Sequence, residues 1–313
     1  MLIIVGKVIS IFAITLIGIA AYKIGVLGED AIKPLTSLMM NITCPCLVLS
    51  SLYSKEFSDS VFDDTITVMI CMLLFYMAAS ALTYFFIRTA KIGHKDDMGV
   101  FIAAVAATNS GFMGFPIVRS LYGSDMLYLM VMGNMMLNVF LFWMEPLILT
   151  IGTDSRTSAK DILKGLKSPI IFSILAGFIM LSMHIRPEGV VDETIVMIGD
   201  VTIPLSMILV GIKLGAVRIK EVASNDNLII SAFAMIVIPT LIIAIMYPIG
   251  ILNNDIKIIV GMTAVLPTAV VAAVIAEQYD KNSLLLSELV SLTTLMSVIT
   301  IPVAAIVMEL LYR

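Results

Sequence analysis

The sequence is short of charge, and this shortage excludes several classes of protein. Charged residues make up 13% of its 313 positions and apolar residues 60%, with a mean hydropathy of +1.06. An ordinary soluble domain is roughly a quarter charged and about half apolar. The composition therefore excludes a soluble globular protein, a disordered chain and a nucleic-acid-binding module, and it indicates a protein of the lipid bilayer.

Histidine and cysteine are also scarce. The two histidines, His94 and His184, lie near the ends of apolar runs, and the chain contains neither an HExxH zinc motif nor a GxSxG nucleophile motif. The three cysteines, Cys44, Cys46 and Cys71, lie inside apolar runs and are interpreted as small buried hydrophobes. We therefore expect no enzymatic activity, no cofactor and no metal site.

Long apolar runs, in contrast, are abundant. A β-barrel would show alternating polarity over about ten residues, whereas the run from Leu228 to Ile249 is apolar almost throughout. If each span takes about 20 residues, ten spans need about 200 and leave roughly 110 for connections. The sequence predicts an all-α polytopic membrane protein with ten transmembrane helices, at 2–22, 32–52, 65–87, 98–121, 125–151, 169–185, 192–214, 227–248, 256–278 and 285–311.

The basic residues predict the orientation. With the N-terminus outside, thirteen lysines and arginines fall on inward ends and loops and six on outward ones. Because cytoplasmic loops carry the excess of basic residues, we expect both termini outside the cell membrane and the linker 152–168 in the cytoplasm. The apolar run from Leu2 lacks a following small-residue cleavage site and is expected to be the first span.

A short motif recurs in the two halves of the chain. Asn41-Ile-Thr-Cys-Pro45 in span two corresponds to Asp200-Val-Thr-Ile-Pro204 in span seven, at an offset of 159. The same offset brings the starts of spans one, three, four and five close to those of spans six, eight, nine and ten, with span six the weakest match. A five-span unit crosses the membrane an odd number of times, so its second copy is inverted. We expect five-helix repeats at 1–151 and 169–313, joined by the short linker.

Two spans carry interruptions at matching depths. Span four reads Ala107-Thr-Asn-Ser-Gly-Phe-Met-Gly-Phe-Pro116, and span nine carries Leu266-Pro-Thr-Ala269. Proline removes a backbone donor and opens the bond to the carbonyl four residues earlier, so both helices are expected to break. The N-termini of half-helices present amide donors and partial positive charge. An anion is therefore expected where the two helices cross, with Asn109 orienting it, since no basic residue falls at the centre of a span.

Two acidic residues inside spans are candidates for coupling or gating, because ionisable groups in a bilayer are functional by default. Asp200 directly precedes the Thr202-x-Pro204 break, although it could equally be a helix-end residue bonded to its neighbours, and Glu145 stands beside Pro146. A proton route through either carboxylate and a sodium site made of freed carbonyls and side-chain oxygens both fit these residues.

At these motifs the sequence resembles the auxin efflux carrier family, which includes plant PIN proteins and bacterial organic-acid permeases. The matching motifs span most of the chain. They are specific to the family when taken together, and no single one of them would suffice. The matching stretches are 109–116 with 121–123, 199–205 with Gly211, 266–269 through 276–279, and 294–302. Plant PINs have a long hydrophilic central loop where this chain has a short one, so it looks like the bacterial members.

The resemblance implies two inverted five-helix repeats, as in bile acid symporters and sodium/proton antiporters. Spans one, two, six and seven would form a scaffold and often a homodimer surface, and the other six a mobile unit. It implies elevator-like transport of organic monoanions or dicarboxylates; a channel or a non-transporting sensor is the alternative. The candidate substrate-binding residues are Asn109, Ser110, Gly111, Pro116, Pro267, Thr268, Asn41 and Thr43, and the coupling candidates are Asp200, Thr202 and Glu145.

Overall fold

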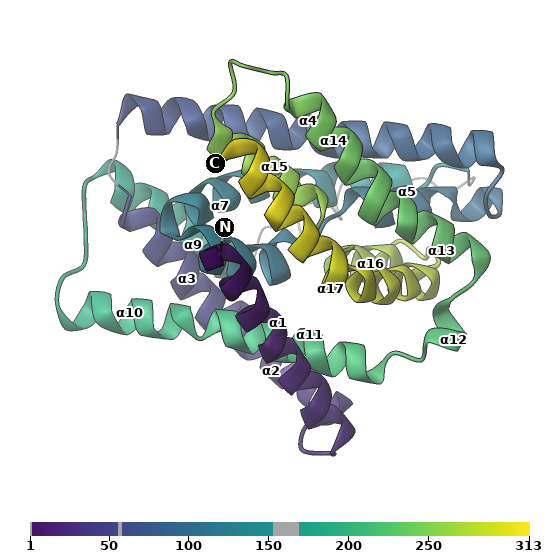
Figure 1. Ribbon diagram of the computed structural model, residues 1–313, viewed down its shortest axis with the longest axis horizontal. Coiled ribbons are helices and arrows are strands. Elements are labelled where there is room, and N and C mark those ends of the chain that lie inside the picture. Colours follow the sequence, from purple (N-terminus) through teal and green to yellow (C-terminus); the bar gives the residue numbers. More distant parts are fainter. Residues whose placement is uncertain (1, 56–57, 153–168) are drawn as a thin grey trace. The chain divides into compact units, whose positions relative to one another are not determined.

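The computed structural model describes residues 2–55, 58–152 and 169–313, and regular structure in these residues is helical (Figure 1). The expectation of an all-α chain is confirmed for this part, whereas the expected linker at 152–168 lies outside the described residues after Gly152. The main helices are α1 (Leu2–Lys23), α2 (Ile32–Leu38), α3 (Cys44–Tyr53), α4 (Asp59–Ala90), α5 (Met98–Ala106), α6 (Phe115–Tyr122), α7 (Ser124–Val139), α8 (Glu145–Leu149), α9 (Pro169–Ser182), α10 (Val190–Asp200), α11 (Thr202–Ala216), α12 (Ile219–Val222), α13 (Asn225–Ala232), α14 (Ile238–Met246), α15 (Asn254–Ala264), α16 (Val270–Gln278) and α17 (Ser283–Tyr312).

Seven helical segments of the described chain are long and apolar enough to cross a membrane. The chain is therefore a multi-pass membrane protein by length and composition. Expected spans four and nine are not among the seven because each is divided into two short helices, and the described part of span six, α9, has 14 residues. The seven are Gly6–Lys23, Glu29–Tyr53, Asp59–Ala90, Ser124–Ile148, Val190–Ala216, Asn225–Met246 and Ser283–Tyr312.

Wide π-helical turns precede four of the prolines. In each case the proline is the second residue after a five-residue π turn, at the start of the next α-helix. Proline has no N–H to donate and its ring clashes with the preceding turn, and the wider turn relieves both problems without ending the helix. The four turns are η2 (Met39–Thr43) before Pro45, η4 (Ser110–Gly114) before Pro116, η5 (Phe140–Met144) before Pro146 and η7 (Phe233–Val237) before Pro239.

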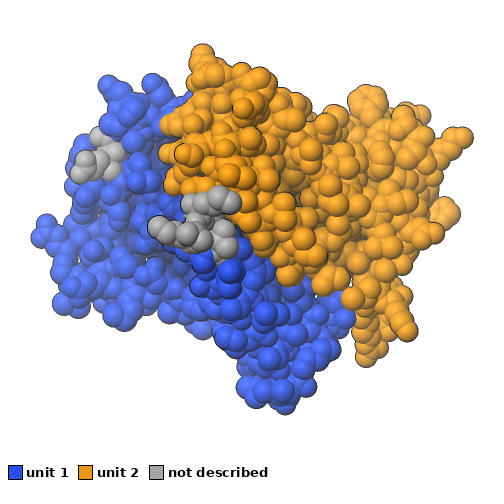
Figure 2. Space-filling view, in the orientation of Figure 1, with its two compact units in different colours: residues 1–67, 111–132, 165–217 blue, residues 68–110, 133–164, 218–313 orange. Residues whose placement is uncertain are grey.

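The chain divides into two compact units, coloured separately in Figure 2. Unit 1 comprises residues 1–67, 111–132 and 165–217. Its central contact joins α1 to α11, where a Cβ added to Gly18 would collide with the backbone of Ile208, and one added to Gly211 with the backbone of Thr15. Small residues that let two helix backbones touch are the usual packing device inside membranes.

Unit 2 comprises residues 68–110, 133–164 and 218–313. Aromatic and methionine side chains fill its interior: the rings of Phe86 and Phe233 stack with centroids 4.1 Å apart, and Met308 of α17 covers Gly261 of α15. This unit contains the residues of both expected interruptions, 107–110 after α5 and 265–269 between α15 and α16, whereas η4 from Gly111 onward and α6 belong to unit 1.

Candidate functional site

The two helix breaks of unit 2 pair with each other. The backbone N–H of Asn109 donates to the carbonyl of Pro267 at 2.7 Å, and the N–H of Ala269 donates to the carbonyl of Ala107 at 2.7 Å. Thr108 and Thr268 thereby form an isolated antiparallel bridge. Non-helical backbone within a membrane must find its partners inside the protein. Here each break satisfies the backbone groups that the other exposes.

Hydroxyl groups reinforce this pairing. The Thr268 hydroxyl donates to the carbonyl of Ala104 at 2.6 Å, and the Thr268 N–H donates to the hydroxyl of Thr293 at 3.1 Å. Ala104 lies near the end of α5, so the Thr268 hydroxyl takes up a carbonyl that the ended helix leaves without an intrahelical donor. Thr268 is therefore occupied in holding the two broken helices together.

Two further polar side chains lie at this pairing: Thr108, whose hydroxyl is buried without a hydrogen-bond partner among the described residues, and Asn109. Asn109 is 7% exposed, and its amide atoms are not among the fully enclosed, unpartnered polar atoms of the described residues. The hydroxyl of the neighbouring Ser110 donates a hydrogen bond to the side-chain oxygen of Asn134. The backbone carbonyl of Asn134 in turn accepts a hydrogen bond from the side-chain amide of Asn138 at 3.1 Å. A polar group that is largely buried but keeps some accessible surface can exchange a water molecule for a ligand, so the Asn109 amide can hydrogen-bond to a ligand here.

The start of the second half-helix has open space beside it. Gly111 has no atom within 4 Å of the position that a Cβ would take, and Pro116 lies buried on the same helical segment, in the first turn of α6. N–H groups at the start of a helix and its partial positive charge favour anions. The described backbone has the interruption that the sequence predicts here, followed by the start of a helix.

Tyr76 is a part of this site that the sequence did not indicate. It is fully buried on α4, its ring stacks on Phe140 with centroids 5.4 Å apart, and its hydroxyl lies beside the hydroxyls of Thr108 and Ser110. The 32-residue helix α4 contains two tyrosines, Tyr76 and Tyr84, and a single sequence does not distinguish them, because only the fold places Tyr76 opposite the break in span four.

The repeated motif meets itself in unit 1. The hydroxyl of Thr202 donates to that of Thr43 at 3.0 Å, and both side chains are buried. These two threonines are related by the offset of 159. Asn41 of the same motif is exposed and bonds to the carbonyl and hydroxyl of Ser37 on its own helix.

We predict a measurable coupling between the two threonines. Removing either hydroxyl as Thr43→Val or Thr202→Val breaks one buried hydrogen bond, and the double variant removes both partners, so a double-mutant cycle should show a coupling of about 1 kcal/mol in the free energy of unfolding. The free energy is measured by denaturant unfolding in mixed micelles. Strict additivity of the two single effects would contradict the bond.

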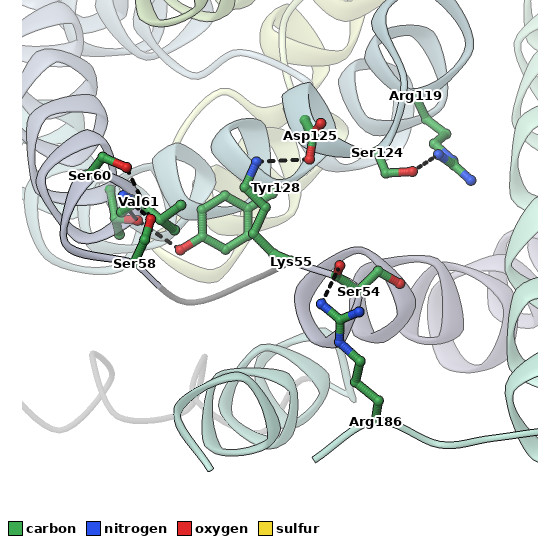
Figure 3. Close-up of polar contacts among 11 residues, drawn as sticks. Ser54, Lys55, Ser58, Ser60, Val61, Arg119, Ser124, Asp125, Tyr128 and Arg186 are labelled. Carbon is green, nitrogen blue, oxygen red and sulfur yellow. Dashed lines mark hydrogen bonds and ion pairs between the residues drawn. The ribbon is translucent and has the colours of Figure 1, made fainter. Parts of the chain in front are cut away.

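Asp200 of unit 1 lies at the end of α10. Its carboxylate is 4.0 Å from the guanidinium of Arg119, and its side chain is 55% exposed. Arg119 in α6 also donates to the hydroxyl of Ser124 (Figure 3). Nearby, Lys55 pairs with Asp125 at 2.8 Å. Asp200 is therefore an exposed, partnered carboxylate at a helix end.

Glu145 is in the opposite situation. It is the first residue of α8 in unit 2, it is 0% exposed, and neither carboxyl oxygen has a hydrogen-bond partner among the described residues. The two coupling candidates thus differ in burial and in partners, a difference that hydropathy alone does not reveal.

Lys213, one of the thirteen basic residues expected on the inward side, contacts the interrupted fourth span. Its ammonium lies 4.8 Å from the centroid of the Phe112 ring, within unit 1. Phe112 belongs to π turn η4 of interrupted span four, so the lysine brings positive charge to the start of that half-helix. Because Lys213 lies in the last turn of α11, its place at a span end gave no sign of this contact in the sequence. No group of three histidine, cysteine, aspartate or glutamate side chains that could hold a metal ion was found in the described residues.

Comparison with known proteins agrees with this architecture. The profile of a family described as membrane transport protein matches residues 3–160 and 154–305. An uncharacterized transporter of Methanothermobacter thermautotrophicus is 24% identical over 303 residues, covering 96% of this chain and 97% of its own. An uncharacterized transporter of Methanocaldococcus jannaschii is 22% identical over 302 residues, covering 94% and 95%. The chain belongs to the membrane transport protein family, the auxin efflux carrier family that its motifs resemble.

Proposed function

We propose that the protein is a secondary active transporter that moves a small organic anion, such as a mono- or dicarboxylate, across the cell membrane. The observation that carries this proposal is the place of the largely buried Asn109 side chain, at the point where two broken helices pair. A transport site needs groups that bind its substrate without holding it irreversibly. A neutral amide and a half-helix N-terminus provide modest binding energy with no fixed countercharge to be exposed when the substrate leaves.

An anion fits this site better than a cation. The N–H groups at the start of η4, beside the open space at Gly111, favour negative charge. The contacts of Ser110 and Thr268 suggest that these two residues support the binding groups.

The ten-helix inverted repeat with elevator-like movement is part of the same proposal. It is supported by the hydrogen bond between Thr43 and Thr202, residues at equivalent positions of the two repeats. The described parts of spans one, two, six and seven fall together in unit 1, along with residues 111–132 of spans four and five. In this scheme spans one, two, six and seven form the scaffold and the surface of a homodimer, the termini lie outside, and 152–168 is the cytoplasmic linker between the repeats.

The substrate class is tested first by binding. Purified protein in lipid nanodiscs is screened by thermal shift against acetate, lactate, benzoate, succinate, malate and citrate. A ligand that binds the folded state at 100 times its Kd stabilises that state by about 2.7 kcal/mol. A raised Tm with a subset of these carboxylates is expected, and failure of the whole panel would count against an organic-anion carrier.

We predict that Asn109→Ala weakens binding of the best carboxylate in that screen. A hydrogen bond to a charged group contributes about 1.5–3 kcal/mol, so Kd should rise by roughly 10- to 150-fold. Asn225→Ala, at an exposed asparagine that begins α13, is the matched control and should leave Kd unchanged. Unchanged Kd in Asn109→Ala would remove this residue from the site.

Transport is then measured in proteoliposomes loaded with that carboxylate. A carrier gives saturable counterflow, in which unlabelled substrate inside the vesicle accelerates entry of labelled substrate. A channel gives flux without counterflow, and a sensor on the same fold binds without flux. Both outcomes would contradict the proposal, and they differ from each other.

A further inference from the structure

Glu145 occupies a closed apolar position at the junction of two helical segments. It begins α8 directly after π turn η5, and Pro146 follows it. Its side chain is 0% exposed, and neither oxygen is hydrogen-bonded within the described chain. An unpaired carboxylate in such surroundings costs several kcal/mol, whereas the neutral acid carries no charge to be desolvated. This conformation therefore accommodates Glu145 with its proton in place.

No described cation compensates Glu145. Helix α8 packs against η5, α5 and α16. Neither α5 nor η5 contains a charged residue, and the one titratable residue of α16 is Glu277, which is exposed. The basic residues with described ion pairs have other partners. Within the described helices that pack against α8, Glu145 therefore faces neither a fixed positive charge nor a buried second carboxylate.

The helices around Glu145 are those that carry the breaks. Helix α5 is the first half of span four, and α16 is the second half of span nine. Turn η5 also reaches the crossing through Phe140, which stacks on Tyr76, the residue beside Thr108 and Ser110. A change at Glu145 therefore acts on segments that hold the proposed substrate site. Turns of the π type are frequent at functional sites of this kind.

We propose that Glu145 carries the coupling proton of the transporter, an inference that rests on the proposed function. In the closed environment described above it holds the proton. When the site opens to water, the O–H bond of the carboxyl breaks, the proton passes to a water molecule and the carboxylate remains, solvated. The carboxylate cannot be enclosed again without a proton or another cation, so each return through the closed conformation carries a proton with it.

The alternative carboxylate, Asp200, is less suited to this role. It is more than half exposed and lies near Arg119, so both solvent and a cation reach its carboxylate in this conformation. A coupling group has to differ between open and closed conformations, and burial without a partner provides that difference at Glu145. Sodium coupling is the competing outcome that the experiments below distinguish.

The first test needs no transported substrate. Trp143 is the only tryptophan of the chain, it lies in η5 two residues before Glu145, and its side chain is 62% exposed. Its fluorescence is recorded against pH in nanodiscs with choline replacing sodium. We expect a single titration in the wild type, its loss in Glu145→Gln and its retention in Glu277→Gln, the exposed control. A titration that persists in Glu145→Gln, or a wild type that shows none while responding to sodium, would overturn the proposal.

Glutamine has the shape of the neutral acid, so Glu145→Gln should fold with the Tm of the wild type. If it does not, Glu145→Asp replaces it, and the midpoint of the titration should move. Infrared difference spectra provide a second readout: the carbonyl band of a protonated carboxylic acid should be present in the wild type and reduced in Glu145→Gln. An unchanged band would contradict a protonated Glu145.

The second test separates coupling from transport. For each coupled proton, a gradient of about one pH unit can sustain up to about tenfold accumulation of the carboxylate. In proteoliposomes free of sodium, the wild type should accumulate the carboxylate, whereas Glu145→Gln should equilibrate it while keeping counterflow. Absence of counterflow in the wild type, with the Trp143 titration intact, would refute the proposed transport and not the proton site. Gradient-driven accumulation by Glu145→Gln would refute the proton site alone.

Discussion

Replacing Gly18 by alanine should unfold the protein at a markedly lower temperature. A Cβ at Gly18 would overlap the carbonyl of Ile208 and press on the Cα of Gly211, both of which are backbone atoms of α11. Neither can rotate away, so α1 and α11 have to separate along their contact. Overpacking of this kind costs about 1–3 kcal/mol and occasionally more, and we expect the upper end because the obstructing atoms are backbone.

The same substitution twelve residues earlier is the control. Gly6 is exposed on α1, and nothing lies within 4 Å of its Cβ position. Alanine is favoured over glycine in a helix by about 1 kcal/mol, so Gly6→Ala should leave Tm unchanged or raise it. Thermal unfolding of both variants in the same detergent measures the difference. A Gly18→Ala protein as stable as Gly6→Ala would show that α1 and α11 do not meet as described.

Thr268→Val should destabilise the pairing of the two breaks and abolish transport with it. Valine keeps the shape but removes the donor to the Ala104 carbonyl, which is then buried without that partner. A buried polar group left without a hydrogen bond costs about 1–3 kcal/mol. This loss of stability weakens the paired, non-helical segments that position Asn109. We expect a lower Tm together with a loss of carboxylate counterflow larger than the fall in stability explains.

Two further variants make that result interpretable. Thr268→Ser retains the hydroxyl and should keep most of the counterflow. Thr240→Val removes a hydroxyl that is exposed and bonded within its own helix, to the carbonyl of Ile236, and should change neither property by much. Equal behaviour of Thr268→Val and Thr240→Val would mean that the bond to Ala104 does not organise the crossing.

The breaks themselves were predictable from the sequence. Proline and glycine among apolar residues leave backbone groups unpaired in a bilayer, so Asn109–Pro116 and Leu266–Ala269 stood out against uniform helices. The offset of 159 likewise matched Thr43 with Thr202 before their hydroxyls were seen to bond. Local chemistry and periodic spacing are properties of the chain alone, and a single sequence contains them.

What could not be predicted depends on contacts between distant segments. The partner of Ser110 is Asn134, and the residue opposite the break is Tyr76, but neither is distinguished by its local sequence. The contrast between Asp200 and Glu145 is of the same kind. Both are acidic residues beside a break or a proline, and only the packing of their helices leaves one exposed and the other enclosed.

The mutual pairing of the breaks has a consequence for synthesis of the protein. Asn109 and its partner Pro267 are separated by 158 positions, which a ribosome needs roughly 10 to 30 seconds to translate at about 5–20 residues per second. During that interval the backbone around Ala107 and Asn109 has no Pro267 or Ala269 to bond, and an exposed amide in hydrocarbon costs several kcal/mol. The interrupted fourth helix therefore has to wait in a hydrated or protein-lined site of the insertion machinery until the ninth has been made.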